Sequence, residues 1–394
     1  MQINLIMKKY ITYFKINRII IVLFLSIVWQ SCVKQIEPDI ELLDVDKYVV
    51  SGMLLDNVGF QTINISKTSD LNDPKPNPVS GCQVKLIRSD NFEKVYYEYA
   101  PGSYKSYITN NYIDKSKSYK IQIKTSDGNI IESSFESFSS CPDVDKVYYE
   151  VVQKEGGYRQ EDYYGYQFYI DLDASETDSK YYLYHLIETF EHHSPYPLEY
   201  WWNGVLHREV PPDYSKMYCW VTTDIKDVFP LSTENLSTNK YSRYKLNYTT
   251  NRTQRLQHTY SLLVEQMSLS KEAYEYWNQM KINLKQTGGM YNNQPIAVKG
   301  NLKSLVNEEK EVLGYFGVSS IKKKRIFVPP SPFRIIDNSC TMQVLRFGYG
   351  EISWTDYPAY IYSEYGIPTN MHMDQTCVDC TKMGGVTTKP SFWP

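Results

Sequence analysis

Motifs of well-known enzyme classes are missing from this sequence of 394 residues. There is no G-x-S-x-G elbow, no H-E-x-x-H pair and no glycine-rich phosphate loop. Their absence excludes the serine hydrolases, zinc metalloproteases and P-loop nucleotide hydrolases that these motifs mark. Asp171, Asp173 and Ser175 imitate the start of a calcium loop, but Glu176 stands where such a loop needs glycine. We therefore expect a protein that is not an enzyme, with no catalytic residues, no metal site and no cofactor.

An excess of basic charge is also missing. The chain carries 42 Lys and Arg against 45 Asp and Glu, a formal net charge of −3. Residues 1–31 contain four of the basic residues and none of the acidic ones, so the remainder has 38 against 45, a formal charge of −7. This balance argues against nucleic acid or an anionic membrane surface as a partner.

Long apolar runs are scarce, and the most informative one lies near the start. The run from Ile19 to Trp29 has 11 residues, well short of the ~20 that a membrane-spanning helix needs. Four basic residues precede it between positions 8 and 18, with no acidic residue before Cys32. This is the charge layout of a signal peptide. Ser31 followed by Cys32 predicts a lipoprotein signal over residues 1–31, with Cys32 as the acylated first residue of the mature chain.

The cleavage site leaves two alternatives open, a plain secretory signal peptide and an uncleaved anchor. Trp29 stands three positions before Cys32, where lipoprotein signals usually carry leucine. Residues 32–46 contain five acidic residues and one basic residue, which predicts a solvated tether. An acidic stretch after the lipidated cysteine resembles the export signal of surface-exposed lipoproteins in Bacteroidota. We expect attachment to the outer membrane, facing the cell exterior.

Alternating apolar residues predict that residues 47–138 form an antiparallel sandwich of immunoglobulin-like type. The alternation is clear in Thr62–Ser66 and at Tyr119, Ile121 and Ile123, and the chain is rich in tyrosine, with 37 residues. Asp127-Gly128 predicts a tight hairpin turn, because glycine readily adopts the positive φ that such turns need. Strand periodicity is lost near Ser139–Pro142, where we place the boundary of the first domain.

Residues 139–394 are expected to form a larger β-rich domain with one amphipathic helix over about 270–286. Ser270 can cap the first backbone amides of this helix, and Glu272 lies in its first turn. Ala273, Trp277 and Leu284 fall on one face together with Met280, which predicts packing onto a sheet. Downstream, residues 312–318 and 325–328 are predicted to form a hairpin, with the lysines at 322–324 in its turn.

Six cysteines follow Cys32, and four of them are widely spaced. We expect some of these to be buried free thiols. Cys377 and Cys380 have the spacing of half a zinc knuckle, but no second pair completes four ligands. In an oxidising compartment they are candidates for disulfides, formed either with each other or with two different partners.

One segment concentrates imidazole and aromatic side chains. Its candidate binding surface comprises His192, His193, Tyr196, Tyr200, Trp201 and Trp202. If the segment is an exposed loop, these side chains could hold a ligand or dock on a partner. The alternative is an ordinary hairpin with aromatic cross-strand pairs.

Several tracts taken together resemble a Bacteroidota outer-membrane lipoprotein family of unknown function. They are Gln266–Lys285, Gly288-Gly289, Gln294-Pro295, Gly300-Asn301, Leu313–Phe316 and the final Cys377-x-x-Cys380-x-x-x-Gly384-Gly385-x-x-x-x-Pro390-x-Phe392-Trp393. Members of that family are typically encoded beside TonB-dependent transporters. The resemblance spans nearly the whole mature chain and implies a partner barrel of that class, but it supplies no catalytic residues.

The expected function is therefore that of a lipid-anchored accessory or substrate-binding partner of a TonB-dependent transporter, with an unidentified ligand. One alternative is a structural or assembly factor of the outer membrane. Another is a hydrolase that uses scattered acidic residues, which would require two carboxylates at a catalytic separation in a cleft.

Overall fold

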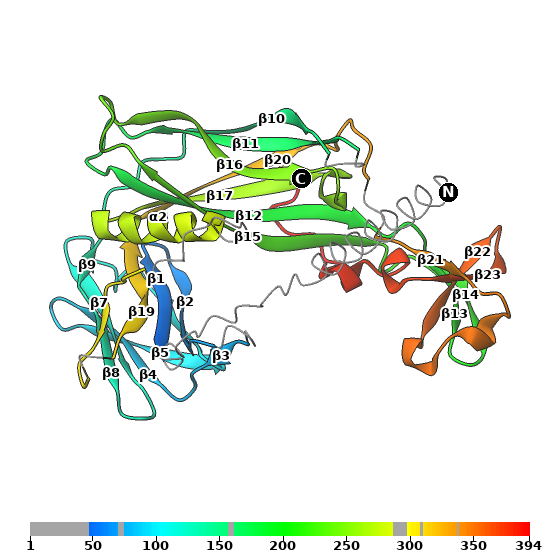
Figure 1. Cartoon of the computed structure of the whole chain (residues 1–394), viewed down its shortest axis with the longest axis horizontal. Coiled ribbons are helices and arrows are strands. Elements are labelled where there is room, and N and C mark those ends of the chain that lie inside the picture. Colours follow the sequence, from blue (N-terminus) through cyan, green and yellow to red (C-terminus); the bar gives the residue numbers. More distant parts are fainter. Residues whose placement is uncertain (1–46, 70–74, 157–160, 287–297, 308–309, 337–338) are drawn as a thin grey trace, which may run out of the picture. The chain divides into compact units, whose positions relative to one another are not determined.

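A computed structural model describes residues 47–69, 75–156, 161–286, 298–307, 310–336 and 339–394. The predicted signal peptide, the tether and Cys32 lie outside these ranges. The prediction of a mainly β fold with one amphipathic helix is confirmed, because strands dominate the described residues and α2 (Lys271–Gln286) is their single α-helix (Figure 1). Within these residues, no helix combines the length and apolar character that crossing a membrane requires.

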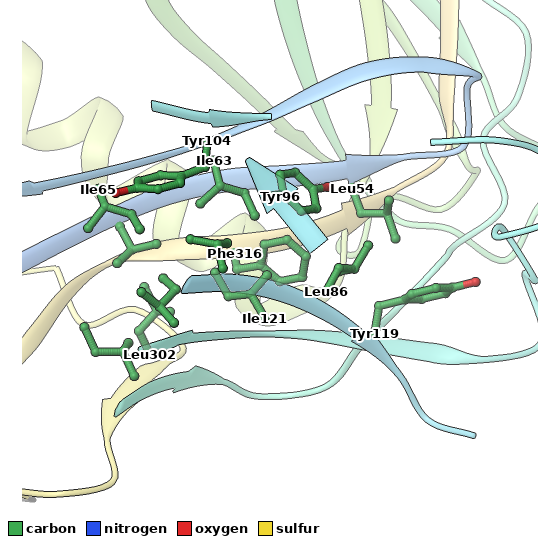
Figure 2. Packing of buried hydrophobic residues seen from close by; sticks show 14 of the residues in the cluster. Leu54, Ile63, Ile65, Leu86, Tyr96, Tyr104, Tyr119, Ile121, Leu302 and Phe316 are labelled. Atoms are coloured by element: carbon green, nitrogen blue, oxygen red, sulfur yellow. The ribbon is translucent and has the colours of Figure 1, made fainter. Parts of the chain in front are cut away.

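The first part of the chain folds into a sandwich. Its strands are β1 (Tyr48–Leu55), β2 (Gly59–Lys67), β3 (Asn77–Pro78), β4 (Gln83–Arg88), β5 (Glu93–Ala100), β6 (Ser103–Ile108), β7 (Ser118–Lys124), β8 (Ile130–Ser133) and β9 (Glu136–Ser137). Alternate side chains point inward and form one closed core, in which Leu54, Ile63, Leu86 and Ile121 are essentially inaccessible to solvent (Figure 2). The predicted turn at Asp127-Gly128 joins β7 to β8, and Gly128 has the positive φ of 87° that it requires.

Two strands from late in the sequence complete this sandwich. β18 (Leu302–Ser304) pairs with β8, and β19 (Val312–Ser319) pairs in parallel with β1 along its whole length. Gly314 permits the close approach, since it has a φ of 103° and a Cβ there would lie 1.8 Å from the carbonyl oxygen of Val50. Phe316 of β19 lies in the middle of the core (Figure 2). The sandwich therefore uses strands from both sides of the predicted boundary near residue 139.

The predicted hairpin over 312–328 is wrong. After β19, the chain passes through Ser320 into β20 (Ile321–Val328), which pairs with β17 (Tyr260–Ser268) in another sheet. The Ser320 carbonyl accepts from the backbone amide of Ser268 at 3.1 Å, which fixes this crossing. The three lysines lie inside β20 and not in a turn. β20 is an edge strand, and lysines on an edge keep it from pairing with other chains.

A second sandwich follows the first. One sheet contains β10 (Lys146–Lys154), β11 (Tyr163–Asp173) and β16 (Lys240–Thr250), and the other contains β15 (Tyr218–Ser232), β12 (Tyr181–His193), β17 and β20. Facing side chains fill the space between them. The rings of Phe168 and Tyr260, for example, stack with centroids 5.7 Å apart. The 3-10 turn η1 (Gln254–Leu256) places Leu256 in the same core.

Helix α2 begins as predicted and packs onto the sheets. The Ser270 hydroxyl accepts from the backbone amide of Ala273 at 3.2 Å, which satisfies one of the free amides of the first turn. Ala273 is buried in a cluster with Met267 and Tyr315, and Trp277 packs against that cluster. The apolar face is shorter than predicted, because the side chain of Leu284 is 53 % exposed.

A five-stranded sheet is formed by β14 (Leu206–Asp213), β13 (Leu198–Trp202), β22 (Ala359–Glu364), β23 (Ile367–Met373) and β21 (Met342–Val344), in that spatial order. Four 3-10 turns accompany it, η2 (Tyr349–Glu351), η3 (Trp354–Asp356), η4 (Gln375–Cys377) and η5 (Cys380–Met383). We call this unit, residues 194–217 and 339–383, the module. It contains most of the predicted binding residues.

Candidate docking module

The module is continuous with the second sandwich through the strand pair β12 and β15. β12 and β15 pair as far as His193 and Tyr218, and the chain between them continues as the hairpin of β13 and β14. The later chain adds β22 beside β13, with Tyr200 opposite Ile361 and Trp202 opposite Ala359. Two segments about 150 residues apart in sequence therefore build one sheet.

Two disulfides lie at the base of the module, and one ties the later segment to β15 while the other closes the later segment on itself. Cys380 is bonded to Cys219 on β15, and Cys377 is bonded to Cys340. Thus Cys377 and Cys380 each bridge to a different partner and not to each other. Backbone contacts reinforce the base, since the amide of Tyr196 donates to the Cys377 carbonyl at 3.1 Å.

The remaining two described cysteines are free thiols. Cys141 is buried, and Cys82 is half-buried against the core of the first sandwich. Within the described ranges, no three His, Cys, Asp or Glu side chains are grouped so that they could hold a metal ion.

The predicted binding residues mostly form the inside of the module. Tyr200 is buried, and its hydroxyl donates to the Gly366 carbonyl at 2.8 Å. The half-buried Trp201 stacks on His207 of β14, with centroids 3.9 Å apart and planes within 9°, and the half-buried Trp202 packs near Tyr349. The geometry is that of a hairpin with aromatic cross-strand pairs, the alternative left open by the sequence. Tyr200 therefore lies outside any exposed surface.

His192 and His193 have different surroundings at the end of β12. His193 is half-buried, stacks on His258 at 3.6 Å, and its Nε2 lies 2.7 Å from a carboxylate oxygen of Glu191. The side chain of His192 is only 1 % exposed, and neither ring nitrogen has a hydrogen-bond partner among the described residues. Burial, together with the nearby imidazoles of His193 and His258, lowers the pKa of His192 to about 4. His192 is thus a neutral interior residue at physiological pH, not a surface ligand.

Exposed apolar side chains of the module were not singled out from the sequence. Four of them are largely exposed to solvent: Phe347 (90 %), Trp354 (79 %), Tyr365 (96 %) and Ile367 (67 %). We call these four the module apolar set. Isolated exposed apolar residues are ordinary on protein surfaces, but large aromatic ones gathered in one small unit are typical of interaction sites.

Tyr365 has an unusual backbone as well as an exposed side chain. It occupies the left-handed region with a φ of 51° and is followed by Gly366 with a φ of 76°, so the two residues form the tight turn between β22 and β23. A left-handed conformation is uncommon for a bulky side chain and costs on the order of 1 kcal/mol. Glycine or asparagine would suit this turn better. The Tyr-Gly pair between two short apolar runs is the sequence signal that could have indicated this turn.

Comparison with known proteins identifies a family whose function is unknown. A family model described as "Domain of unknown function (DUF4249)" matches residues 33–325. Among curated proteins, none matches the chain significantly. Among solved structures, the chain is similar to Escherichia coli alpha-2-macroglobulin activated by porcine elastase, with 9 % identity and a TM-score of 0.20 over 77 % of this chain and 21 % of that one. The chain therefore spans about a fifth of the length of that structure.

Proposed function

The chain belongs to the DUF4249 family of unknown function, and on that premise we propose that it is a lipid-anchored outer-membrane protein that docks on a TonB-dependent transporter barrel through the module. In this proposal it has no enzymatic activity of its own. It acts as an accessory or substrate-binding partner of the barrel.

The observation that carries this proposal is the module apolar set. Its four side chains are mostly exposed. Ile367 lies on β23, Tyr365 in the turn before it, Trp354 in η3 and Phe347 in the loop after β21, all within a unit that contains two disulfides at its base. Aromatic anchors on a rigid support are the usual centres of binding energy in protein interfaces, because little conformational entropy is lost when they are buried. Docking would also account for the left-handed Tyr365, since strained residues tend to occur at functional positions.

Two further observations support export to an oxidising compartment. Disulfides persist in secreted and envelope proteins and are rare in the cytosol, and this chain has two, one of which joins cysteines 161 residues apart in sequence. The predicted lipoprotein signal ends at Cys32, where acylation would anchor the mature chain. Each buried acyl methylene contributes about 0.8 kcal/mol, so several chains together suffice for stable attachment. A Cys32→Ser variant is expected to lose both the added mass and the membrane association.

The docking proposal is tested by affinity purification from outer membranes in mild detergent. A tagged wild-type chain is expected to recover a TonB-dependent barrel, whereas a Trp354→Ser, Tyr365→Ser double variant is expected to recover much less. The matched control is Tyr97→Ser, which removes a 71 % exposed tyrosine from the first sandwich and should leave recovery unchanged. Recovery of the lipoprotein alone, with wild-type protein at normal abundance, would contradict the proposal.

A deletion strain separates this function from the alternative of an assembly factor. Loss of growth on one nutrient is expected for a transporter partner. A general envelope defect, such as sensitivity to detergents on every growth medium, would instead indicate a structural or assembly role.

A further inference from the structure

The outer face of the first sandwich has a hollow that the proposed function does not use. Residues Glu93–Tyr96 of β5 pair with β4, whereas Tyr97–Ala100 pair with β6, so β5 crosses from one layer of the sandwich to the other. The pairing is irregular between Glu98 and Ala100. A hollow of about 420 Å³ lies over this crossing, a size within the range of small-molecule sites.

The walls of the hollow are aromatic because of strand alternation. Ile63, Tyr96 and Tyr104 point into the core of the sandwich (Figure 2), so their neighbours along β2, β5 and β6 face outward. The outward side chains that line the hollow are Phe60, Val95, Tyr97, Tyr99, Lys105 and Tyr107. Phe60 and Tyr107 meet edge to face at 5.2 Å, and Tyr97 is 71 % exposed. These rings are not needed to close the core.

Lys105 supplies a positive charge in the middle of this aromatic surface. Its ammonium lies 4.2 Å from the ring centroid of Tyr99 and 5.1 Å from that of Phe60. No carboxylate of the described residues forms an ion pair with it. Aromatic faces attract the cation, but they do not neutralise its charge.

The two carboxylates that line the hollow are already engaged. The Glu93 carboxylate binds Lys85 at 2.9 Å. The Glu98 carboxylate accepts from the backbone amides of Gly81 at 2.9 Å and Gly102 at 3.3 Å. Two lysines of the lining, Lys94 and Lys105, form no ion pair with a described carboxylate, and Lys105 is the one whose ammonium lies over the aromatic rings. A complementary ligand has one negative group and a flat apolar body that can lie against the rings.

From this arrangement we infer that the hollow binds small organic anions, namely carboxylates attached to a planar apolar group. The carboxylate pairs with the ammonium of Lys105, and the planar body stacks on Tyr97 and Tyr99. The site is on the first sandwich, so it does not depend on docking by the module.

Two ligands of nearly equal shape test this inference, 2-naphthoate and the neutral 2-naphthylmethanol. Binding to the purified chain is followed by ligand-observed NMR, which detects weak affinities. The wild type is expected to prefer the anion by about tenfold, the size of a charge-assisted hydrogen bond. Lys105→Gln should remove that preference, Lys105→Arg should retain it, and Tyr97→Ala should weaken both ligands.

The matched control is Lys154→Gln. Lys154 also lies over an aromatic ring, 3.8 Å from the centroid of Tyr248, but outside the hollow. This variant should keep the wild-type preference. Equal binding of the two ligands by the wild type, loss of preference in Lys154→Gln, or no binding of either ligand at about 10 mM would overturn the inference. Thermal unfolding of each variant ensures that a loss of binding is not a loss of folding.

Discussion

The first sandwich and the module reach a stable structure by different means. The sandwich buries a large continuous core, with many side chains at or near zero exposure. The module instead has two small buried clusters, one around Tyr200 and Ile361 and one around Tyr360 and Met373, with two disulfides at its base. A small unit cannot bury enough apolar surface to stabilise itself, so covalent links supply part of the stability. The module can then leave aromatic residues exposed, as its four-residue apolar set does.

A matched pair of phenylalanines gives the largest expected difference between the two regions. Phe316→Ala should lower the free energy of unfolding by about 3–5 kcal/mol, because the ring is fully buried in the sandwich core and its removal leaves a cavity. Phe347→Ala should cost less than about 0.5 kcal/mol, since that ring is 90 % exposed. Urea denaturation measures both. Similar losses for the two variants would show that the module, too, depends on its apolar side chains.

Removal of a disulfide should affect the module and leave the first sandwich intact. The Cys340→Ser, Cys377→Ser double variant is expected to lose about 2–4 kcal/mol, mainly through greater freedom of the unfolded chain. Hydrogen exchange should show faster opening of β21–β23 and unchanged protection of β1, β4 and β7. Cys82→Ser, which changes a free thiol, is the control. Equal loss of protection in both regions would contradict the division drawn above.

Lowering the pH should destabilise the folded chain through His192, which lies at the junction between the second sandwich and the module. The pKa of His192 is lowered to about 4 in the folded chain, whereas an unfolded histidine titrates near 6.5. The contribution of neutral His192 to the free energy of unfolding is therefore complete above about pH 6.5 and is lost as the pH decreases toward 4. Between pH 7 and pH 5 the free energy of unfolding should fall by about 2 kcal/mol.

The His192→Phe variant tests this dependence, because it keeps a buried ring that cannot take up a proton. Its stability should change less than that of the wild type between pH 7 and pH 5, as measured by urea denaturation at each pH. His207→Gln removes a more exposed imidazole and should leave the wild-type dependence in place. An unchanged pH dependence in His192→Phe would contradict the assignment.

Local features of the fold could be predicted from the sequence, whereas distant pairings could not. Alternation at Ile121 and Ile123, glycine in the turn at Gly128 and the capping hydroxyl of Ser270 each act within a few residues, so their patterns can be recognised. The parallel pairing of β19 with β1 depends on strands far apart in the chain, and no local pattern specifies it. The run of lysines at 322–324 predicts a turn, but an edge strand tolerates the same residues, and β20 is such a strand.

The candidate site was predicted in part, for a similar reason. The sequence drew attention to Tyr200 and Trp201, which belong to the module, but aromatic residues look alike in a sequence whether they are buried or exposed. Tyr360 is buried on β22, while Tyr365, five residues later, is 96 % exposed. The difference arises from the turn and from which face of the sheet is covered. The disulfide partners of Cys377 and Cys380 likewise depend on the tertiary fold, because spacing alone permits several pairings.

The pairing of β1 with β19 also sets an order of events during biosynthesis. Tyr48 lies opposite Val312, so the first strand of the sandwich must wait for a partner that is made 264 residues later. At ~5–20 residues per second, synthesis of the intervening chain takes roughly 15–50 s. In that interval the apolar side chains of β1 lack one of their two neighbouring strands. The earliest part of the described chain is therefore among the last to complete its pairing.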